Sequence, residues 1–131
     1  MEVNELVSPV SKIFEVREFL VQQQRRLGTE KGVVMDGRDI GTVVFPQAEL
    51  KIFMTASAST RAQRRYDELK AKGDDVSYDE VLKNVQERDY IDTHRDDSPL
   101  VIADSAIEID NSDLTRQEQF DTVLGLVNDL Q

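Results

Sequence analysis

The segment from Val33 to Thr42 constrains the fold more than any other part of the chain. An apolar, β-branched run ends abruptly in Asp-Gly-Arg-Asp, which is typical of a buried parallel strand that emerges at a sheet edge. Two glycines would let the backbone turn sharply and approach a bound group. Arg38 offers a planar fork of donors suited to phosphate, and Asp39 offers acceptors. A strand followed by a polar turn with an incidental ion pair explains the segment equally well.

The rest of the chain alternates between predicted helices and predicted strands. Helices are expected from Ser8-Pro9 to Gly28, over 57–72, from 78 into the low 90s, and onward from Thr115; strands are expected at about 33–36, 50–55 and 106–110. Capping boxes open the last two helices, at Ser77–Glu80 and Thr115–Glu118. Gly73 is a fitting terminator of the helix over 57–72. This alternation predicts an α/β layered fold with a parallel sheet.

Bulk properties narrow the function classes. The 131 residues indicate one domain, 1–131, and the net charge of −10 disfavours nonspecific binding to nucleic acid. No apolar run approaches the roughly 18 residues of a membrane span. The chain has no cysteine, so it has no disulfide framework and no thiolate metal site. These features fit a cytoplasmic protein. Because arginines gather locally in an acidic chain, a small anionic ligand is expected.

A pair of arginines brackets a carboxylate in the predicted helix that starts at 78. Arg88, Asp92 and Arg95 are spaced four and then three residues apart, so a helix places them on one face. This arrangement can hold a phosphate-rich ligand while the acid fixes a ribose hydroxyl or orients an arginine. The alternative is an exposed ion pair of neighbouring turns, which contributes only a few tenths of a kcal/mol, roughly.

A second arginine group lies in the predicted helix over 57–72. Arg61, Arg64 and Arg65 could close over a nucleotide as a mobile lid. They could equally form a solvated helix surface, because Asp67 and Glu68 follow at once.

Together these segments resemble the bacterial cytidylate kinases, the (d)CMP kinases of the P-loop nucleoside monophosphate kinases. The resemblance spans nearly all 131 residues. It rests on Asp36-Gly37-Arg38-Asp39-Ile40-Gly41-Thr42-Val43-Val44-Phe45-Pro46, Lys51-Ile52-Phe53, Arg61-Ala62-x-Arg64-Arg65, Glu87-Arg88-Asp89-x-x-Asp92-x-x-Arg95 and Pro99-Leu100. It implies a partial P-loop kinase fold of three layers, in which the first strand and the phosphate loop are missing.

The resemblance also implies roles for individual residues. Ser8, Arg17 and Asp39 match positions that contact the cytosine base. Arg38 matches a position that binds the acceptor phosphate, Arg88 and Asp92 match positions near the acceptor's phosphate and sugar, and Arg95 matches an arginine directed at phosphate. By this resemblance the catalytic residues are Arg38, Arg88 and Arg95, and the lid over ATP, at about 57–75, carries Arg61, Arg64 and Arg65. No metal ligand is assigned.

Members of the family begin with a strand and a glycine-rich phosphate loop, and this chain contains no Gly-Lys-Ser/Thr. It is therefore expected to be the C-terminal part of such a kinase. The parent would transfer the γ-phosphoryl group of ATP, with Mg²⁺, to CMP or dCMP, and this chain alone is expected to be inactive. Its expected partners are small-molecule nucleotides rather than nucleic acid or membrane. The alternatives are a non-catalytic nucleotide-recognition or interaction module completed by another chain, and a fragment of a normal enzyme.

The missing strand would lie between the strands at about 33–36 and 50–55 in this family. The two flanking strands are therefore expected either to pair directly, with local rearrangement, or to be covered by self-association through the sheet edge. Weak binding of CMP and a stability below that of an intact kinase are also expected.

Overall fold

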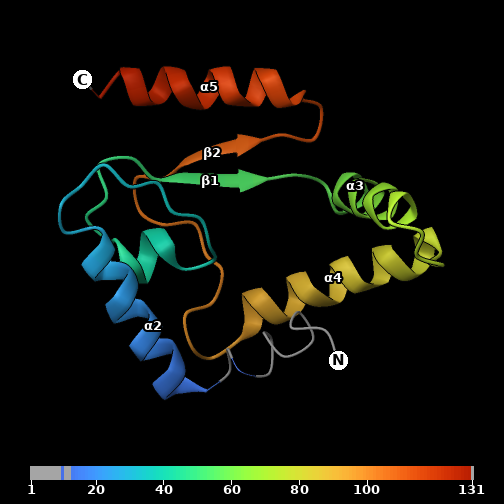
Figure 1. The fold of residues 1–131 in the computed structure, drawn as a ribbon, viewed down its shortest axis with the longest axis horizontal. Coiled ribbons are helices and arrows are strands. Elements are labelled where there is room, and N and C mark those ends of the chain that lie inside the picture. The colour runs from blue at the N-terminus through green and yellow to red at the C-terminus, as the bar shows by residue number, and fades with distance from the viewer. Residues whose placement is uncertain (1–9, 11–12, 131) are drawn as a thin grey trace.

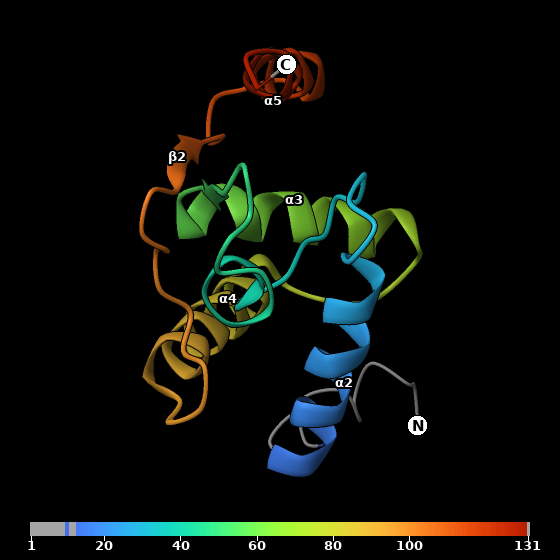
Figure 2. The ribbon, with the colours of Figure 1, turned by 90° about the vertical axis from the view of Figure 1, so that its left-hand side faces the viewer.

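A computed structural model describes Val10 and residues 13–130. The helices are α2 (Phe14–Leu27), α3 (Ala58–Ala71), α4 (Tyr78–His94) and α5 (Arg116–Asn128), with a five-residue π-helix, η1 (Ile40–Val44); the strands are β1 (Ile52–Thr55) and β2 (Ile107–Asp110). In Figures 1 and 2, α5 lies on one side of the two strands, and α2 and α4 lie on the other. None of the described helices is long and apolar enough to cross a lipid bilayer.

The two strands form a parallel sheet in which Ile52 lies opposite Ile107 and Thr55 lies opposite Asp110. The ladder continues beyond the last pair, where the Asn111 amide donates to the Thr55 carbonyl at 2.8 Å. Parallel neighbours need a long crossover connection, which α3 and α4 provide. The prediction of an α/β fold with a parallel sheet is therefore confirmed, as are the strands expected at 50–55 and 106–110.

The strand predicted at about 33–36 is wrong. These residues belong to no strand, and Val34 is completely exposed. An extended segment becomes a strand only when a neighbouring backbone offers hydrogen-bond partners, and β1 pairs with β2 alone in the described sheet. The expected direct pairing of 33–36 with 50–55 is wrong for the same reason.

The predicted capping boxes are both present. Ser77 Oγ accepts from the Glu80 amide and the Glu80 carboxylate accepts from the Ser77 amide, at the start of α4. Thr115 and Glu118 repeat the arrangement at the start of α5. These reciprocal bonds satisfy amides that a helix start leaves unpaired. Both helices therefore begin where the sequence predicts.

Gly73 ends α3 as predicted. Its φ of 89° is the left-handed conformation that glycine adopts readily. The Asp74 amide donates to the Leu69 carbonyl and the Gly73 amide donates to the Lys70 carbonyl, both at 3.0 Å. This double closure is the Schellman arrangement, and it turns the chain back toward α4.

Gly28 follows the last residue of α2, where the sequence predicts that the helix ends. Its φ is −85°, so the left-handed conformation is not required. Instead, a Cβ atom at Gly28 would lie 2.3 Å from Cε1 of Phe45. Arg25 strengthens the same junction by donating to the carbonyls of Val43 and Val44, at 2.5 and 3.2 Å. The contact docks α2 on η1. The predicted start of this helix at Ser8-Pro9 lies outside the described residues.

The hydrophobic core of the described residues is small. Its buried members are Val44, Ala62, Val81 and Ile109. Helix α5 carries large apolar side chains, yet Phe120 is 58% exposed and no residue of that helix is buried. The buried side chains therefore come from η1, α3, α4 and β2, and none comes from α2 or α5.

Candidate functional site

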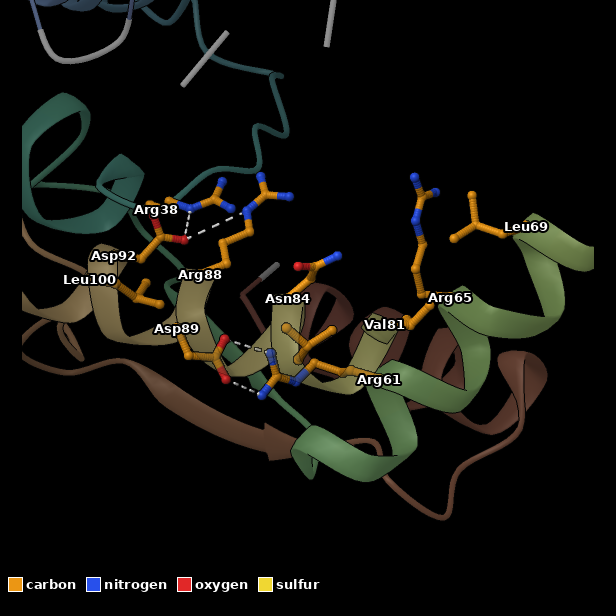
Figure 3. Close-up of a pocket in the computed structure, with 11 residues that line it drawn as sticks. Arg38, Arg61, Arg65, Leu69, Val81, Asn84, Arg88, Asp89, Asp92 and Leu100 are labelled. Carbon is orange, nitrogen blue, oxygen red and sulfur yellow. Dashed lines mark hydrogen bonds and ion pairs between the residues drawn. The ribbon is translucent and has the colours of Figure 1, made fainter. Parts of the chain in front are cut away.

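The first part of the site joins the segment before η1 to α4. Arg38 Nε forms an ion pair with Asp92 Oδ2, and Arg88 Nε lies 4.0 Å from the same oxygen (Figure 3). The Asp92 side chain is only 15% exposed. The predicted placement of Arg88 and Asp92 on one helix face is therefore present, and Arg38 joins it from 54 residues earlier in the chain. The prediction that Arg95 shares this face is wrong, because α4 ends at His94 and Arg95 has an extended backbone.

The second part joins α2 to the residue just before η1. Arg17 Nη2 donates to Asp39 Oδ2 at 3.0 Å, and both side chains are less than a fifth exposed. Neighbouring donors and acceptors of this kind can recognise a base whose edge presents both. The sequence singled out both residues but gave no sign that they contact each other. Ser8, the third expected base contact, lies outside the described residues.

Arg95 lies within the field of both ion pairs. Burial lowers the pKa of Arg95 most, followed by the positive charge of Arg17, while the carboxylates of Asp39 and Asp92 act in the opposite direction. Its Nε donates to the Ser98 carbonyl at 2.7 Å. An arginine stays protonated in any case. Four guanidinium groups therefore gather around two carboxylates, which leaves a net positive charge in an acidic protein.

A third ion pair fastens α3 to α4. Arg61 donates from Nη1 and Nη2 to the two oxygens of Asp89 at 2.7 and 2.6 Å, and from Nε to the Ala56 carbonyl at 3.0 Å. The hydrogen bonds from Arg61 lower the pKa of Asp89, with smaller contributions from Arg38 and Arg88. The sequence suggested no role for Asp89, because its partner lies 28 residues earlier.

An open cavity of about 570 Å³ lies among these groups. Figure 3 shows Arg38 and Arg88 toward one end of this cavity and Arg65 toward the other. The cavity is lined by Arg38, Arg61, Arg65, Leu69, Val81, Asn84, Val85, Arg88, Asp89, Asp92 and Leu100. Sequence reasoning missed Asn84, although it lies one helical turn before Arg88.

A second open cavity, of about 470 Å³, is lined by Arg61, Arg64, Arg65, Glu68 and Arg116. Arg64 lines only this cavity and donates to the side chain and the carbonyl of Asn111, at 2.9 and 2.6 Å. The three predicted lid arginines therefore divide: Arg61 and Arg65 border both cavities, and Arg64 reaches the end of β2. Nothing in the sequence distinguished Arg116.

Within the described part of the chain, no group of three or more histidines, cysteines and acidic residues could hold a metal ion. The site is a pocket lined by arginines, which suits an anion. Guanidinium groups border the open cavity, and Asp39, Asp89 and Asp92 each accept a hydrogen bond from a guanidinium group.

Comparisons with known proteins identify relatives of this chain. A family model described as cytidylate kinase matches residues 1–129. A cytidylate kinase of Flavobacterium johnsoniae is 72% identical over 130 residues, which are 99% of this chain and 56% of that relative. Cytidylate kinases of Bacteroides fragilis and Caldanaerobacter subterraneus are 61% and 54% identical over 119 and 121 residues, covering 52% and 54% of those relatives. The chain thus spans about half the length of the curated relatives it matches.

Proposed function

Because the chain belongs to the cytidylate kinase family, we propose that it carries the acceptor-nucleotide site of an enzyme that transfers the γ-phosphoryl group of ATP to CMP or dCMP, giving CDP or dCDP. One observation supports this proposal: the Arg17–Asp39 and Arg38–Asp92 ion pairs are joined through the consecutive residues Arg38 and Asp39. In the proposal, the first pair binds the base and the second pair binds the phosphate.

The Arg17–Asp39 pair fits the hydrogen-bonding edge of cytosine. Cytosine presents an amino donor next to ring acceptors, so it needs a carboxylate beside a donor. Asp39 accepts from the amino group and Arg17 donates to the ring acceptors. The hydrogen bonds with cytosine then replace the one between Arg17 and Asp39. Uracil has a carbonyl where cytosine has the amino group, and that carbonyl would face the carboxylate of Asp39 with repulsion.

The phosphate side rests on Arg38, Arg88 and Arg95. A phosphate offers charge-assisted acceptors to a planar guanidinium, so it takes the place that the Asp92 carboxylate occupies beside Arg38. Released from this pair, Asp92 accepts from a sugar hydroxyl. These three arginines are the catalytic groups of the proposal, because they hold the acceptor phosphate where it meets the γ-phosphoryl group.

ATP with Mg²⁺ is the proposed donor of the whole enzyme, with Arg61, Arg64 and Arg65 over its phosphates. The 131 residues contain no Gly-Lys-Ser/Thr. Phosphoryl transfer depends on a loop that holds the β- and γ-phosphates. We therefore expect residues 1–131 by themselves to bind the acceptor but not to transfer a phosphoryl group.

A different reading, a recognition or interaction module completed by another chain, is favoured by the apolar surface. Large hydrophobic side chains that are at least half exposed include Phe14, Phe19, Leu27, Val34 and Phe120, and apolar area of this kind marks an interaction surface. Self-association would cover it. A sedimentation coefficient that rises with protein concentration would support that reading.

Calorimetric titration of the 131-residue chain with CMP and with UMP tests the proposal. We expect weak binding that favours CMP and that Arg38→Ala abolishes. Arg26→Ala, which removes the same charge from an exposed position of α2, should leave the affinity nearly unchanged. Equal binding of CMP and UMP, or equal loss in both variants, would contradict the proposed acceptor site.

A further inference from the structure

The two arginine-lined cavities share a wall that contains Arg61. Three of the five N–H groups of this side chain are engaged: Nε with the Ala56 carbonyl, and one on each terminal nitrogen with Asp89. Two N–H groups remain. The guanidinium therefore has a fixed plane and unused donors, which is the condition in which an arginine binds an anion without first having to be ordered.

Asp89 supplies that fixation from α4. Both of its oxygens accept from Arg61 (Figure 3). The two helices pack against each other, and each has one buried residue, Ala62 in α3 and Val81 in α4. The other charged groups that act on Asp89 are Arg38 and Arg88, which belong to the proposed phosphate site. The carboxylate thus stands between the acceptor side and α3, although its oxygens are occupied by Arg61 rather than offered to a ligand.

We propose that Asp89 is a positioning residue: it holds Arg61 in the wall common to both cavities, with two N–H groups directed to the oxygens of a bound polyphosphate. The inference rests on the proposed function for the nature of the ligand. It also predicts that a carboxylate, Asp89, improves the binding of an anion, which the net charge of the site would not lead one to expect.

This requirement fixes the sign of a measurable effect. If Asp89 only lowered the positive charge, its removal would raise the affinity for any anion, because opposing charge is lost near Arg38 and Arg88. If Asp89 positions Arg61, its removal lowers that affinity, because Arg61 must then be ordered at the expense of binding. The two roles therefore predict changes in opposite directions.

The test is calorimetric titration of the 131-residue chain with inorganic pyrophosphate. Asp89→Asn should weaken binding about threefold or more, since an ordered charged donor is lost. Glu87→Gln, which removes the same charge from an exposed neighbour on α4, should bind as well as the parent or slightly better. In an Arg61→Ala background, Asp89→Asn should strengthen binding instead, because only its electrostatic effect remains.

The proposal would be overturned if Asp89→Asn bound pyrophosphate as tightly as the unsubstituted 131-residue chain, or more tightly. It would also be overturned if the unsubstituted chain did not bind pyrophosphate. Circular dichroism shows whether Asp89→Asn unfolds α3. If it does, Asp89→Glu is the second variant: it retains the charge, and it should bind pyrophosphate nearly as well as the unsubstituted chain. A parent that binds pyrophosphate but does not prefer CMP to UMP would contradict the proposed function and leave the role of Asp89 intact.

Discussion

The α3–α4 pair and helix α5 begin with equally good local signals, yet they end in different environments. Both α4 and α5 start with a complete capping box. The α3–α4 interface buries Ala62 and Val81, and an edge-on contact between Tyr66 and Tyr78 adjoins it, with ring centroids 6.2 Å apart. No described residue of α5 is buried. Capping fixes where a helix begins, whereas burial of its apolar face depends on what lies opposite.

The surface area expresses the same difference. The chain exposes 10005 Å², whereas a compact folded monomer of 14.9 kDa exposes about 7,000 Å² by the scaling of area with mass. The excess is consistent with apolar faces on α2 and α5 that nothing described here covers. The charged site, by contrast, is assembled from α2, the segment before η1 and α4.

A newly introduced carboxylate should give the largest difference in stability between the α3–α4 interface and α5. Ala62→Asp places a carboxylate at a completely buried position of the α3–α4 interface that lines neither arginine cavity, and we expect it to lower the free energy of unfolding by about 3 kcal/mol or more. Val127→Asp on α5, where the side chain is 37% exposed, should cost less than about 1 kcal/mol. Urea denaturation of both variants measures the difference; similar costs would show that α5 is as well packed as the α3–α4 interface.

Two glycine substitutions should act in opposite directions. Gly28→Ala forces a Cβ against the Phe45 ring and should destabilise by about 1–3 kcal/mol, as overpacking does. Gly125→Ala meets no atom within 4 Å and should stabilise by about 0.5–1 kcal/mol, because alanine favours the helix interior. Thermal unfolding midpoints should move in opposite directions, and a decrease for Gly125→Ala would indicate that α5 is covered at that position.

The base-recognition pair can be altered without changing its shape. Asp39→Asn keeps one acceptor but turns an amide donor toward the cytosine amino group, so the preference for CMP over UMP should fall about tenfold. Binding of inorganic pyrophosphate should not weaken, because Asp39 contributes only an opposing charge near Arg95 on the phosphate side. Titration with the three ligands measures this selectivity; a variant that distinguishes CMP from UMP as well as the parent does would remove Asp39 from the base site.

Acidification should loosen the start of α5 by a small amount. Hydrogen bonds from the Thr115 amide and hydroxyl lower the pKa of Glu118. A folded-state pKa below the unfolded value means that this contribution is fully present above about pH 4.3 and is lost as the pH falls through the lower folded pKa. The protection factors of amides in the first turn of α5, which correct for the intrinsic slowing of exchange in acid, should fall across that window in the unsubstituted chain and not in Glu118→Gln. An identical pH response in both would exclude Glu118 as its source.

The sequence predicted what is local or already encoded in the family motif. Caps at Ser77 and Thr115, the left-handed terminator Gly73 and the helical spacing of Arg88 and Asp92 depend on neighbours within one or two turns, and all are present. The segment 33–36 was predicted wrongly because a strand depends on a partner strand. The Arg61–Asp89 pair escaped prediction because it depends on how α3 packs against α4.

The most direct test of the account is a two-dimensional ¹H–¹⁵N NMR titration of the chain with CMP, using side-chain and backbone signals. We expect shifts to concentrate at Arg17, Arg38 and Asp39, at Arg88 and Asp92 on α4, and at Arg95 just after that helix. The signals of α5 should remain unchanged, and UMP should produce a weaker response. Shifts centred on α5, or identical responses to CMP and UMP, would contradict the central claim that these ion pairs form a cytosine-nucleotide site.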